Sequence, residues 1–454
     1  MAVKRYDGSA WQVVAGKGDQ GTSSSIATWV KTASGGETSL SGNDDNSQPL
    51  SYTVGQELVF INGALQKRGV DYTATTGTSI TGLTALVAND VVTVWTVNAF
   101  SVANTYTQAQ VDAAFVNNTN YWSAGKNKII NGDFAINQRG FSSVTASAQF
   151  TFDRFKTLLS GGTVTYTPET FTLGSAPVSG YEAKNYLRIV TSGQSAASDY
   201  AAIFQPIESV RTFAGQTVTV SFWAKAASGT PNIAVNLLQL FGGGGSPSAN
   251  VSNPGTKQTL TTSWARYSFT INVASISGKT LGTDGTDRLS AYIYVSAGSD
   301  YNTQSDTMGI QNNTFDIWGV QVEAGSVATA FQTATGNPAS ELAACQRYFV
   351  RFGDTNQGYG VMSWGQAYAT THVMSFVPLP VTMRVKPSSI TFTNLRVNDW
   401  TSYISVSTMV IENNYTTPQL LALDATVTGA TTKIPYTLGQ DNNTAGKLEV
   451  NAEL

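Results

Sequence analysis

The sequence predicts an all-β chain made of several modules. Its longest regular runs alternate apolar and polar residues at period two, and loops rich in Gly, Ser, Asn and Asp separate them. Only 12% of the 454 residues are charged, about half the usual share of about 25%. One short segment has a helical pattern. We therefore expect a small N-terminal β module, a short helix, a central β-sandwich and a C-terminal β-sandwich.

Charge and composition exclude several functional classes. Lys and Arg number 26 against 29 Asp and Glu, and they are not clustered, so nucleic acid is not an expected partner. Cys345 is the single cysteine, which excludes an intrachain disulfide framework. No apolar run approaches the roughly 20 residues that span a bilayer, so we expect no membrane insertion. Residues 1–8 do not resemble a signal peptide, and we expect folding in a cytoplasm without secretion.

The first hundred residues divide into two segments. Residues 1–48 are rich in Gly, Ser, Thr and Asp, and we expect an extended anchoring segment that orders only against a partner. Residues 49–100 form a small β module. In it Asn62-Gly63 predicts a type I′ turn after the strand 58–61, and 91–97 is a further strand of β-branched residues.

Residues 101–123 carry the helical pattern. Thr107 and Gln110 have the spacing of a capping box. One helical face would hold the residues at spacing i, i+3, i+4 and i+7, namely Val111, Ala114, Phe115 and Asn118. A helix this short needs burial. It either packs on a neighbouring domain or forms a parallel three-helix bundle.

Residues 124–336 read as an antiparallel sandwich. We expect its first strand in Lys126–Gly140, where Asn131–Asp133 would form a turn or bulge. Three later strands alternate clearly, at 217–224, 264–273 and 288–295. A boundary follows near 336, because Asn337-Pro338 suits the N-cap and first position of a short helix. Residues 337–454 then form a separate distal β domain.

Several phrases in order resemble one class of protein. The phrases are Ile130-Asn-Gly-Asp-Phe134, Phe152-Asp-Arg-Phe155, Ser221-Phe-Trp-Ala-Lys225, Thr262-Ser-Trp-Ala-Arg-Tyr267, Phe315-Asp-Ile-Trp-Gly-Val-Gln-Val-Glu-Ala-Gly325 and Glu341-Leu-Ala-Ala-Cys-Gln-Arg-Tyr-Phe349. Together they resemble the receptor-side half of bacteriophage tail fibres, in which a jelly roll like a carbohydrate-binding module precedes a distal tip. The stretch Leu58–Trp95 resembles the virion-attachment modules of fibres from short-tailed phages, especially those of marine cyanobacteria.

The resemblance implies a homotrimeric fibre in the tail of a virion. Its N-terminus would dock on portal, adaptor or nozzle-type tail proteins, and its C-terminal β domains would bind a host surface polysaccharide. No cofactor is expected. Alternatives are a virion decoration or collar protein that never contacts the host, and a polysaccharide depolymerase. A secreted carbohydrate-binding module of a cell is disfavoured by the missing signal sequence.

Candidate glycan-binding residues fall in both large β domains. In the central sandwich, alternation places four residues away from the core, namely Trp223, Arg266, Tyr292 and Tyr294. They would either stack on sugar rings or fill an interface or lie under loops. In the distal domain the candidates are Trp364, Tyr368 and Trp400, because recognition is usually located in the loops of a rigid sandwich. Ordinary core and turn roles are the alternative.

Acidic residues near strand ends fall in phrases where the jelly rolls that this chain resembles sometimes hold a structural calcium ion. The candidate ligands are Asp133, Asp316 and Glu323, with Asp153 as a further acid in the same phrases. Calcium needs six to eight oxygen ligands at one point, and salt bridges or turn caps are the alternative. No catalytic motif such as G-x-S-x-G or H-E-x-x-H is present, and we expect no enzymatic activity. The sole histidine, His372, is expected to be structural.

Overall fold

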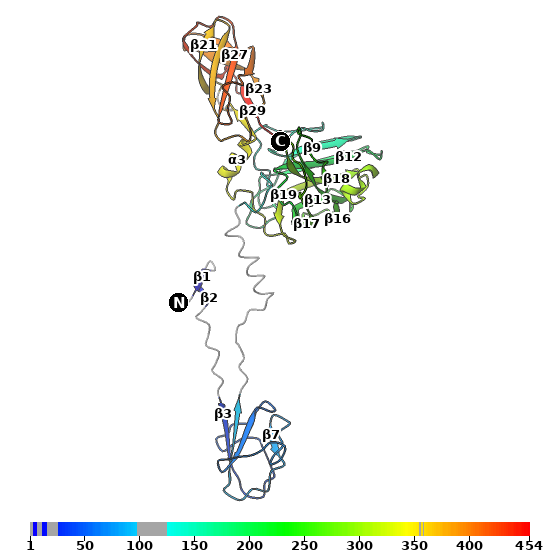
Figure 1. The fold of residues 1–454 in the computed structure, drawn as a ribbon, viewed down its shortest axis with the longest axis vertical. Helices are drawn as coiled ribbons and strands as arrows, with labels where there is room; N and C mark the ends of the chain where they lie inside the picture. Colours follow the sequence, from blue (N-terminus) through cyan, green and yellow to red (C-terminus); the bar gives the residue numbers. More distant parts are fainter. Residues whose placement is uncertain (1–2, 7–10, 16–25, 98–124, 354–355, 357) are drawn as a thin grey trace. The chain divides into compact units, whose positions relative to one another are not determined.

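Strands make up almost all regular structure in this protein. The computed structural model describes residues 3–6, 11–15, 26–97, 125–353, 356 and 358–454. The predicted all-β class is confirmed (Figure 1). The chain divides into two compact units, Met1–Phe115 and Val116–Leu454. No helix within the described ranges is long and apolar enough to cross a membrane.

The predicted helix 101–123 lies outside the described residues. The same holds for its expected buried face of Val111, Ala114, Phe115 and Asn118.

The first unit contains two small antiparallel sheets and a separate strand pair. The four-stranded sheet has the order β3-β8-β5-β6, and β4 pairs with β7. β1 (Val3–Tyr6) pairs with β2 (Trp11–Ala15). The other strands are β3 (Ile26–Thr32), β4 (Ser39–Ser41), β5 (Glu57–Ile61), β6 (Ala64–Leu65), β7 (Ser79–Thr81) and β8 (Val91–Val97). Asn62 and Gly63 have φ of 47° and 81°, as the predicted type I′ turn between β5 and β6 requires.

The N-terminal module begins near residue 26 rather than at 49. β3 pairs with β8 along its whole length, and Trp29 of β3 is buried in the core of the module. The carboxylate of Asp44 accepts hydrogen bonds from the backbone N–H groups of Asn46 and Gln48, both at 2.8 Å. Residues 26–48 are therefore part of the fold. Their polar composition concealed this because few of them face the core.

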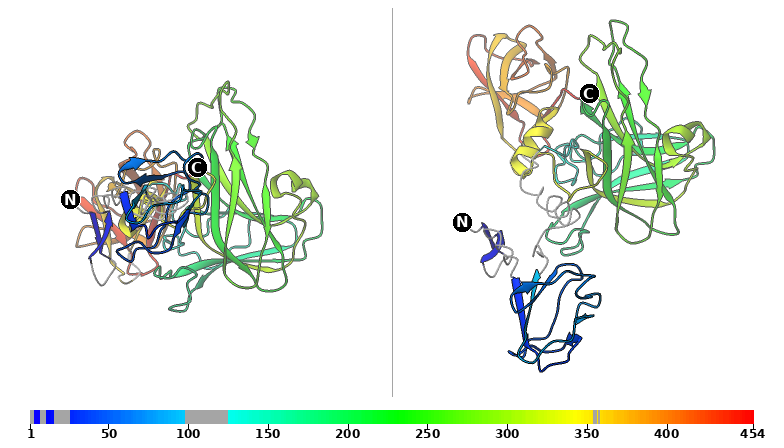
Figure 2. Two further views of the ribbon diagram at one scale, coloured as in Figure 1. Left: turned by 90° about the horizontal axis from the view of Figure 1, so that it is seen from below. Right: turned by 60° about the horizontal axis from the view of Figure 1, so that its bottom comes forward.

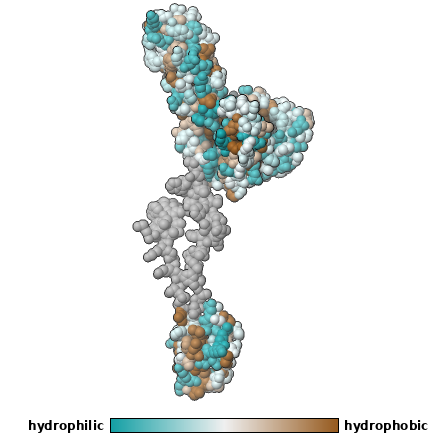
Figure 3. Space-filling view, in the orientation of Figure 1, coloured by the Kyte–Doolittle hydropathy of each residue, from teal (hydrophilic) through white to brown (hydrophobic). Residues whose placement is uncertain are grey.

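The outward face of the four-stranded sheet is also apolar. Leu58 and Trp95 are paired across β5 and β8 and are exposed. Leu65 of β6 is exposed beside Phe60, whose ring lies 5.0 Å from that of Trp95. Figure 3 shows apolar surface on this module. Exposed apolar patches of this kind often mark interaction sites.

The central sandwich packs two sheets face to face (Figure 2). One sheet has the order β10-β11-β19-β13-β17. The other has the order β15-β14-β18-β12-β9, and β16 pairs with β14. The strands are β9 (Lys156–Ser160), β10 (Thr163–Thr170), β11 (Asn185–Ser192), β12 (Tyr200–Glu208), β13 (Thr217–Ala226), β14 (Asn232–Leu240), β15 (Val251–Ser252), β16 (Thr256–Thr259), β17 (Ala265–Asn272), β18 (Arg288–Ala297) and β19 (Thr314–Ala324).

The predicted alternation fixes the inner faces of this sandwich. Val218, Val220 and Phe222 of β13 are buried in the core. Tyr267 and Phe269 of β17 face the same core. The inward residues of β18 are also as predicted: Leu289, Ala291, Ile293 and Val295. Burial on one face of each strand therefore follows directly from period-two patterning.

The expected first strand at Lys126–Gly140 is wrong, because the segment consists of turns and irregular chain. Asn131 has φ of 61°, and its side chain bonds both the N–H and the carbonyl of Ile136. A Cβ on Gly132 would lie 2.1 Å from the carbonyl oxygen of Val320. The Asn-Gly-Asp sequence therefore forms a tight loop against β19 rather than a bulge within a strand.

A short helix connects the sandwich to the C-terminal domain. α3 (Pro338–Gln346) begins as predicted, with Asn337 accepting a hydrogen bond from the N–H of Ser340 at 2.9 Å. Two short turns, η2 (Ser299–Tyr301) and α2 (Asn302–Ser305), follow β18 within the sandwich.

The C-terminal domain has sheets of three and seven strands around a second core. Their orders are β20-β29-β23 and β25-β24-β28-β21-β22-β27-β26. The strands are β20 (Phe349–Phe352), β21 (Val361–Ala369), β22 (His372–Pro378), β23 (Ser389–Thr393), β24 (Leu395–Asn398), β25 (Tyr403–Ser405), β26 (Thr408–Ile411), β27 (Leu420–Thr426), β28 (Pro435–Gln440) and β29 (Lys447–Asn451).

A buried ion cluster joins the sandwich to the C-terminal domain. The guanidinium of Arg154 pairs with the carboxylate of Glu453, and their side chains are 1% and 5% exposed. Arg154 also donates to the carbonyl of Pro206 at 2.7 Å and lies over the ring of Tyr348 at 3.4 Å. Arg139 donates to the same carboxylate at 3.1 Å. The two domains therefore share one set of buried charges.

We predict that Arg154→Ala lowers the free energy of unfolding by about 3–5 kcal/mol, because it leaves Glu453 buried without its main partner. Chemical unfolding followed by tryptophan fluorescence measures this change. The matched control is Arg347→Ala, which breaks the pair of Arg347 and Glu208, whose side chains are 40% and 36% exposed. That variant should lose about 0–1 kcal/mol. Equal losses in the two variants would contradict the role given to Arg154.

Candidate functional site

Trp223 and Arg266 lie on the outward face of the five-stranded sheet, but later chain covers them. Arg266 stacks over Trp223 with its guanidinium carbon 4.7 Å from the ring centroid. It donates to the carbonyl of Thr329 at 2.5 Å. The Trp223 ring lies 5.4 Å from Trp318 and 6.0 Å from Phe331. Thr329 and Phe331 belong to the segment after β19. Trp223 and Arg266 therefore lie under a connecting segment, which is one of the alternatives stated above.

Tyr292 and Tyr294 lie on the outward face of the six-stranded sheet and are also covered. Tyr294 is 4% exposed, in a small cluster with Ala202 and Met308. Tyr292 is half-buried and stacks on Phe204 at 4.8 Å and 18°. Burial raises the pKa of both tyrosine hydroxyls. Neither ring offers an open face of the kind that a sugar needs.

The candidate calcium ligands do not come together. Asp316 pairs with Arg188 at 2.8 Å and with Lys225 at 3.5 Å. Glu323 accepts a hydrogen bond from the N–H of Thr329 at 2.9 Å. Asp133 accepts a hydrogen bond from Tyr181. Asp153 pairs with Arg139 and accepts a hydrogen bond from Gln138. Within the described ranges no three potential metal ligands form a group.

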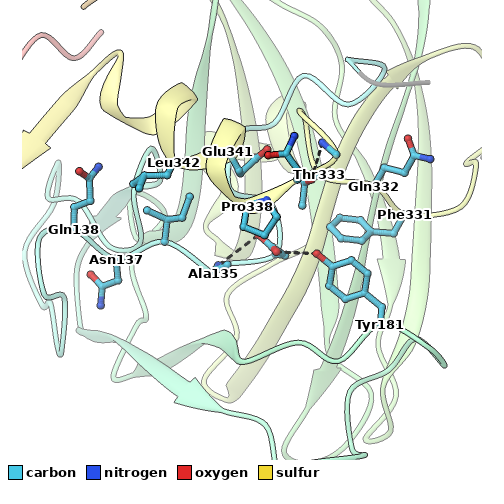
Figure 4. A pocket seen from close by; sticks show the side chains of 14 residues that line it. Ala135, Asn137, Gln138, Tyr181, Phe331, Gln332, Thr333, Pro338, Glu341 and Leu342 are labelled. Carbon is cyan, nitrogen blue, oxygen red and sulfur yellow. Dashed lines mark hydrogen bonds between the residues drawn. The ribbon is translucent and has the colours of Figure 1, made fainter. Parts of the chain in front are cut away.

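A cavity of about 840 Å³ lies beside Asp133. Tyr181 and Phe331 form one wall, and Pro338 and Leu342 of α3 form another (Figure 4). Asp133 accepts a hydrogen bond from the hydroxyl of Tyr181 at 2.8 Å, and burial raises the pKa of this carboxyl. The remaining wall combines Ala135, Ile136 and Gly336 with six polar residues, namely Asn137, Gln138, Gln332, Thr333, Asn337 and Glu341.

The open aromatic surface lies on the seven-stranded sheet. Residues paired across antiparallel strands point to the same face. One such row crosses five strands from β25 to β22, through Tyr403, Asn398, Thr437, Trp364 and Phe376. Its three aromatic side chains are 61%, 60% and 41% exposed in that order. Asn398 and Thr437 lie buried between them. The row therefore has exposed rings on either side of two buried polar residues.

Tyr368 and His372 extend this face at one end of β21 and β22. Their rings stack at 5.5 Å and 23°. The hydroxyl of Tyr368 donates to Asp424 at 2.8 Å, and His372 Nδ1 lies 3.0 Å from the same carboxylate. Desolvation and the bond to Asp424 raise the pKa of Tyr368 to about 12. The ring stays 56% exposed. His372 thus contacts Asp424 and the ring of Tyr368 within this aromatic face.

A cavity of about 620 Å³ opens at the other end of the row. Its residues are Tyr359, Val361, Arg396, Asn398, Trp400, Tyr403, Thr437, Gly439, Gln440, Asp441 and Asn442. Trp400 is 68% exposed with φ of 72°. The backbone N–H of Trp400 donates a hydrogen bond to the side-chain oxygen of Asn398 at 2.5 Å. The carboxylate of Asp399 accepts hydrogen bonds from the backbone N–H groups of Thr401 and Ser402. This tight loop holds the indole out of the core.

We define the outer aromatic face as Tyr359, Trp364, Tyr368, Phe376, Trp400 and Tyr403. It contains the predicted distal candidates Trp364, Tyr368 and Trp400. Phe376 and Arg396 were missed as site residues. The alternation of Val373, Ser375 and Val377 inward could have placed Phe376 outward. Nothing in the sequence alone brings Arg396 to the cavity, because β24 meets β28 only through long-range pairing.

Comparisons with known proteins give likenesses in structure only. No protein-family model matches the chain, and no curated protein matches its sequence. The enzymatically active domain of tailspike protein 4 from bacteriophage CBA120 is similar at 14% identity and a TM-score of 0.27. The likeness covers 45% of this chain, which spans only 22% of the tailspike chain.

Carbohydrate-binding modules are also similar. A family 11 module from Clostridium thermocellum, in complex with a β-1,3-1,4-mixed-linked tetrasaccharide, has 9% identity and a TM-score of 0.25, covering 41% of this chain and 98% of the module. The xylan-binding CBM22-2 domain from Paenibacillus barcinonensis Xyn10C has 17% identity and a TM-score of 0.25, covering 40% and 98%. At these values no statement about the function of this chain rests on the likeness.

Trp223 is packed and Trp400 is exposed, so replacing each one tests which aromatic residues support the fold. We predict that Trp223→Ala lowers the free energy of unfolding by about 2–4 kcal/mol, because it removes a ring packed on Trp318 and Phe331. Trp400→Ala, at an exposed position, should change it by less than about 0.5 kcal/mol. Urea unfolding of the full chain measures both. A large loss for Trp400→Ala would mean that its ring supports the fold.

Proposed function

We propose that this chain is a tail-fibre protein of a bacteriophage that binds a host surface glycan through its C-terminal domain. The observation that carries the proposal is the outer aromatic face. Three of its exposed rings, Tyr403, Trp364 and Phe376, stand in register across one sheet, next to a cavity. Three strand spacings of about 4.8 Å each separate Tyr403 from Trp364, so the face is long enough for several sugar rings of one chain.

The chemistry of the face suits a saccharide. One side of a sugar ring presents C–H groups that pack on an aromatic ring, and its edge presents hydroxyls that need hydrogen-bond partners. Trp364 and Phe376 supply the rings, and Asn442 supplies an exposed amide at the cavity. Pockets that combine apolar walls with a few polar groups are typical ligand sites. Weak contacts at each copy would add through multivalency.

The proposed attachment of this chain to the virion is inferred from its N-terminal module. The stretch Leu58–Trp95 resembles virion-attachment modules, and its sheet has an exposed apolar outer face around Leu58 and Trp95. We infer that this module docks on a portal, adaptor or nozzle-type tail protein. Three copies would assemble through the helix expected at 101–123. A decoration or collar role remains the alternative, in which the aromatic face would contact other virion proteins.

A depolymerase is the other candidate function. Cleavage of a glycosidic bond by the usual route requires two carboxylates facing each other across the bond. Among the described residues that line the cavity, Asp441 is the one carboxylate. Adhesion without cleavage is therefore the activity that this geometry supports best.

We predict that the double variant Trp364→Ala/Phe376→Ala weakens binding to the recognised polysaccharide by roughly tenfold or more, the usual cost of losing a central aromatic contact. Affinity electrophoresis of the full chain against a panel of purified bacterial surface polysaccharides measures this. Trp95→Ala, which removes an exposed ring from the N-terminal module, is the matched control. Binding that the double variant retains in full would exclude this face as the glycan site.

We also predict a trimer in solution, with a mass three times the 48.1 kDa of one chain. The variant Val111→Asp changes the expected buried face of the helix. It should shift the mass toward that of a single chain, because the carboxylates of three copies would meet at one point. Light scattering of both proteins measures this. A wild-type protein that stays at 48.1 kDa at high concentration would contradict the fibre assembly while leaving glycan binding open.

A further inference from the structure

Arg396 occupies an unusual position in the cavity of the C-terminal domain. It lies on β24, on the same face as Tyr403, and is half-buried. Its guanidinium carbon is 4.2 Å from the ring centroid of Tyr403 and 4.7 Å from that of Tyr359. Contact with two tyrosine rings restricts the plane of the guanidinium while leaving its N–H edge available. This is the arrangement in which arginine binds a planar anion.

The residue opposite Arg396 is a glycine against which the backbone of Gly360 packs. Gly439 of β28 pairs with Arg396 in register. A Cβ at Gly439 would lie 2.6 Å from the carbonyl oxygen of Gly360, so no side chain fits there. Thr437 and Asn398 continue the floor of the cavity. Arg396 itself lines this cavity and is half-buried, so a ligand can approach its guanidinium from solvent.

Arg396 has no carboxylate partner among the described residues. Several other arginines do: Arg154 and Arg139 pair with Glu453, Arg188 with Asp316, and Arg347 with Glu208. Asp441 also lines the cavity, but its Oδ2 accepts a hydrogen bond from the hydroxyl of Ser405 at 2.6 Å. Among the described residues Arg396 therefore forms no ion pair, and it lies beside open aromatic rings with Asp441 at another part of the cavity wall.

We propose that the glycan bound by this face is acidic, and that Arg396 binds its anionic group. This inference rests on the proposed function. A saccharide carboxylate matches the two N–H groups of a guanidinium edge, and a sulfate ester offers the same acceptor geometry. The neighbouring rings of Tyr403, Tyr359 and Trp400 would pack on the sugar that carries the anion. The aromatic face then supplies contact area, and Arg396 supplies selectivity for charge.

The test compares matched polymers that differ only in charge. Affinity electrophoresis of the full chain uses polygalacturonate against its methyl-esterified form, and dextran sulfate against dextran. We expect at least one charged polymer to bind roughly tenfold or more tightly than its neutral partner, because a charge-assisted hydrogen-bonded pair is at stake. Arg396→Gln should abolish that difference. Arg396→Lys should keep part of it, since the charge stays and the planar fork is lost.

The control variant is Arg211→Gln, which removes the same charge from an exposed position outside the cavity. It should behave as the wild type, and equal thermal midpoints should verify that all variants are folded. A response to polygalacturonate alone identifies a carboxylate, and a response to dextran sulfate alone identifies a sulfate.

Two results would overturn the proposal. If wild type and Arg396→Gln bind charged and neutral polymers equally, the proposed selectivity for an acidic glycan is wrong. Glycan binding by this face would not be contradicted by that result. Absence of binding to all four polymers and to the wider polysaccharide panel would remove glycan binding as well.

Discussion

The buried guanidinium of Arg154 is the constraint on which the arrangement of the second unit depends. A charge with its side chain 1% exposed must be paired and hydrogen-bonded. Its partners come from separate parts of the chain: Glu453 after β29, Tyr348 after α3, and the carbonyl of Pro206 in β12. The pairing is complete only when both β domains are folded and in contact. The three-stranded sheet of the C-terminal domain is thereby held against the sandwich.

Two sheets of this unit carry outward rows of aromatic and basic residues. One row is covered by a connecting segment, and the other is exposed to solvent. On the five-stranded sheet, chain that follows β19 returns across Trp223 and Arg266, with Phe331 and Thr329 as the covering contacts. On the seven-stranded sheet, Trp364 remains 60% exposed. The strand pattern is the same in both cases. The difference between a packed and an open aromatic row arises from a connecting segment, not from the strands.

The sequence predicts which side chains share a face of a strand, but not which outward face a connecting segment covers. Period two placed Phe222 and Ile293 inside because the strands have one buried face, and the Asn337-Pro338 cap placed the start of α3. Lys126–Gly140 was assigned wrongly, since its apolar residues pack as a loop held by Asn131. Trp364 and Trp400 were found among the candidates, whereas Trp223 was not separable from them. Which row is covered depends on contacts between residues about a hundred positions apart, which no local pattern contains.

Arg154 and Arg396 illustrate how the same interaction serves stability at one position and recognition at another. Both guanidinium groups lie against tyrosine rings. Arg154 is buried, so a built-in carboxylate is required and the site is closed. Arg396 is half-buried and keeps contact with water, so it can remain unpaired at small cost while the protein is free. An anion that arrives there meets a charge already oriented and partly desolvated by its neighbours. Its binding therefore loses less entropy than pairing with a free side chain would.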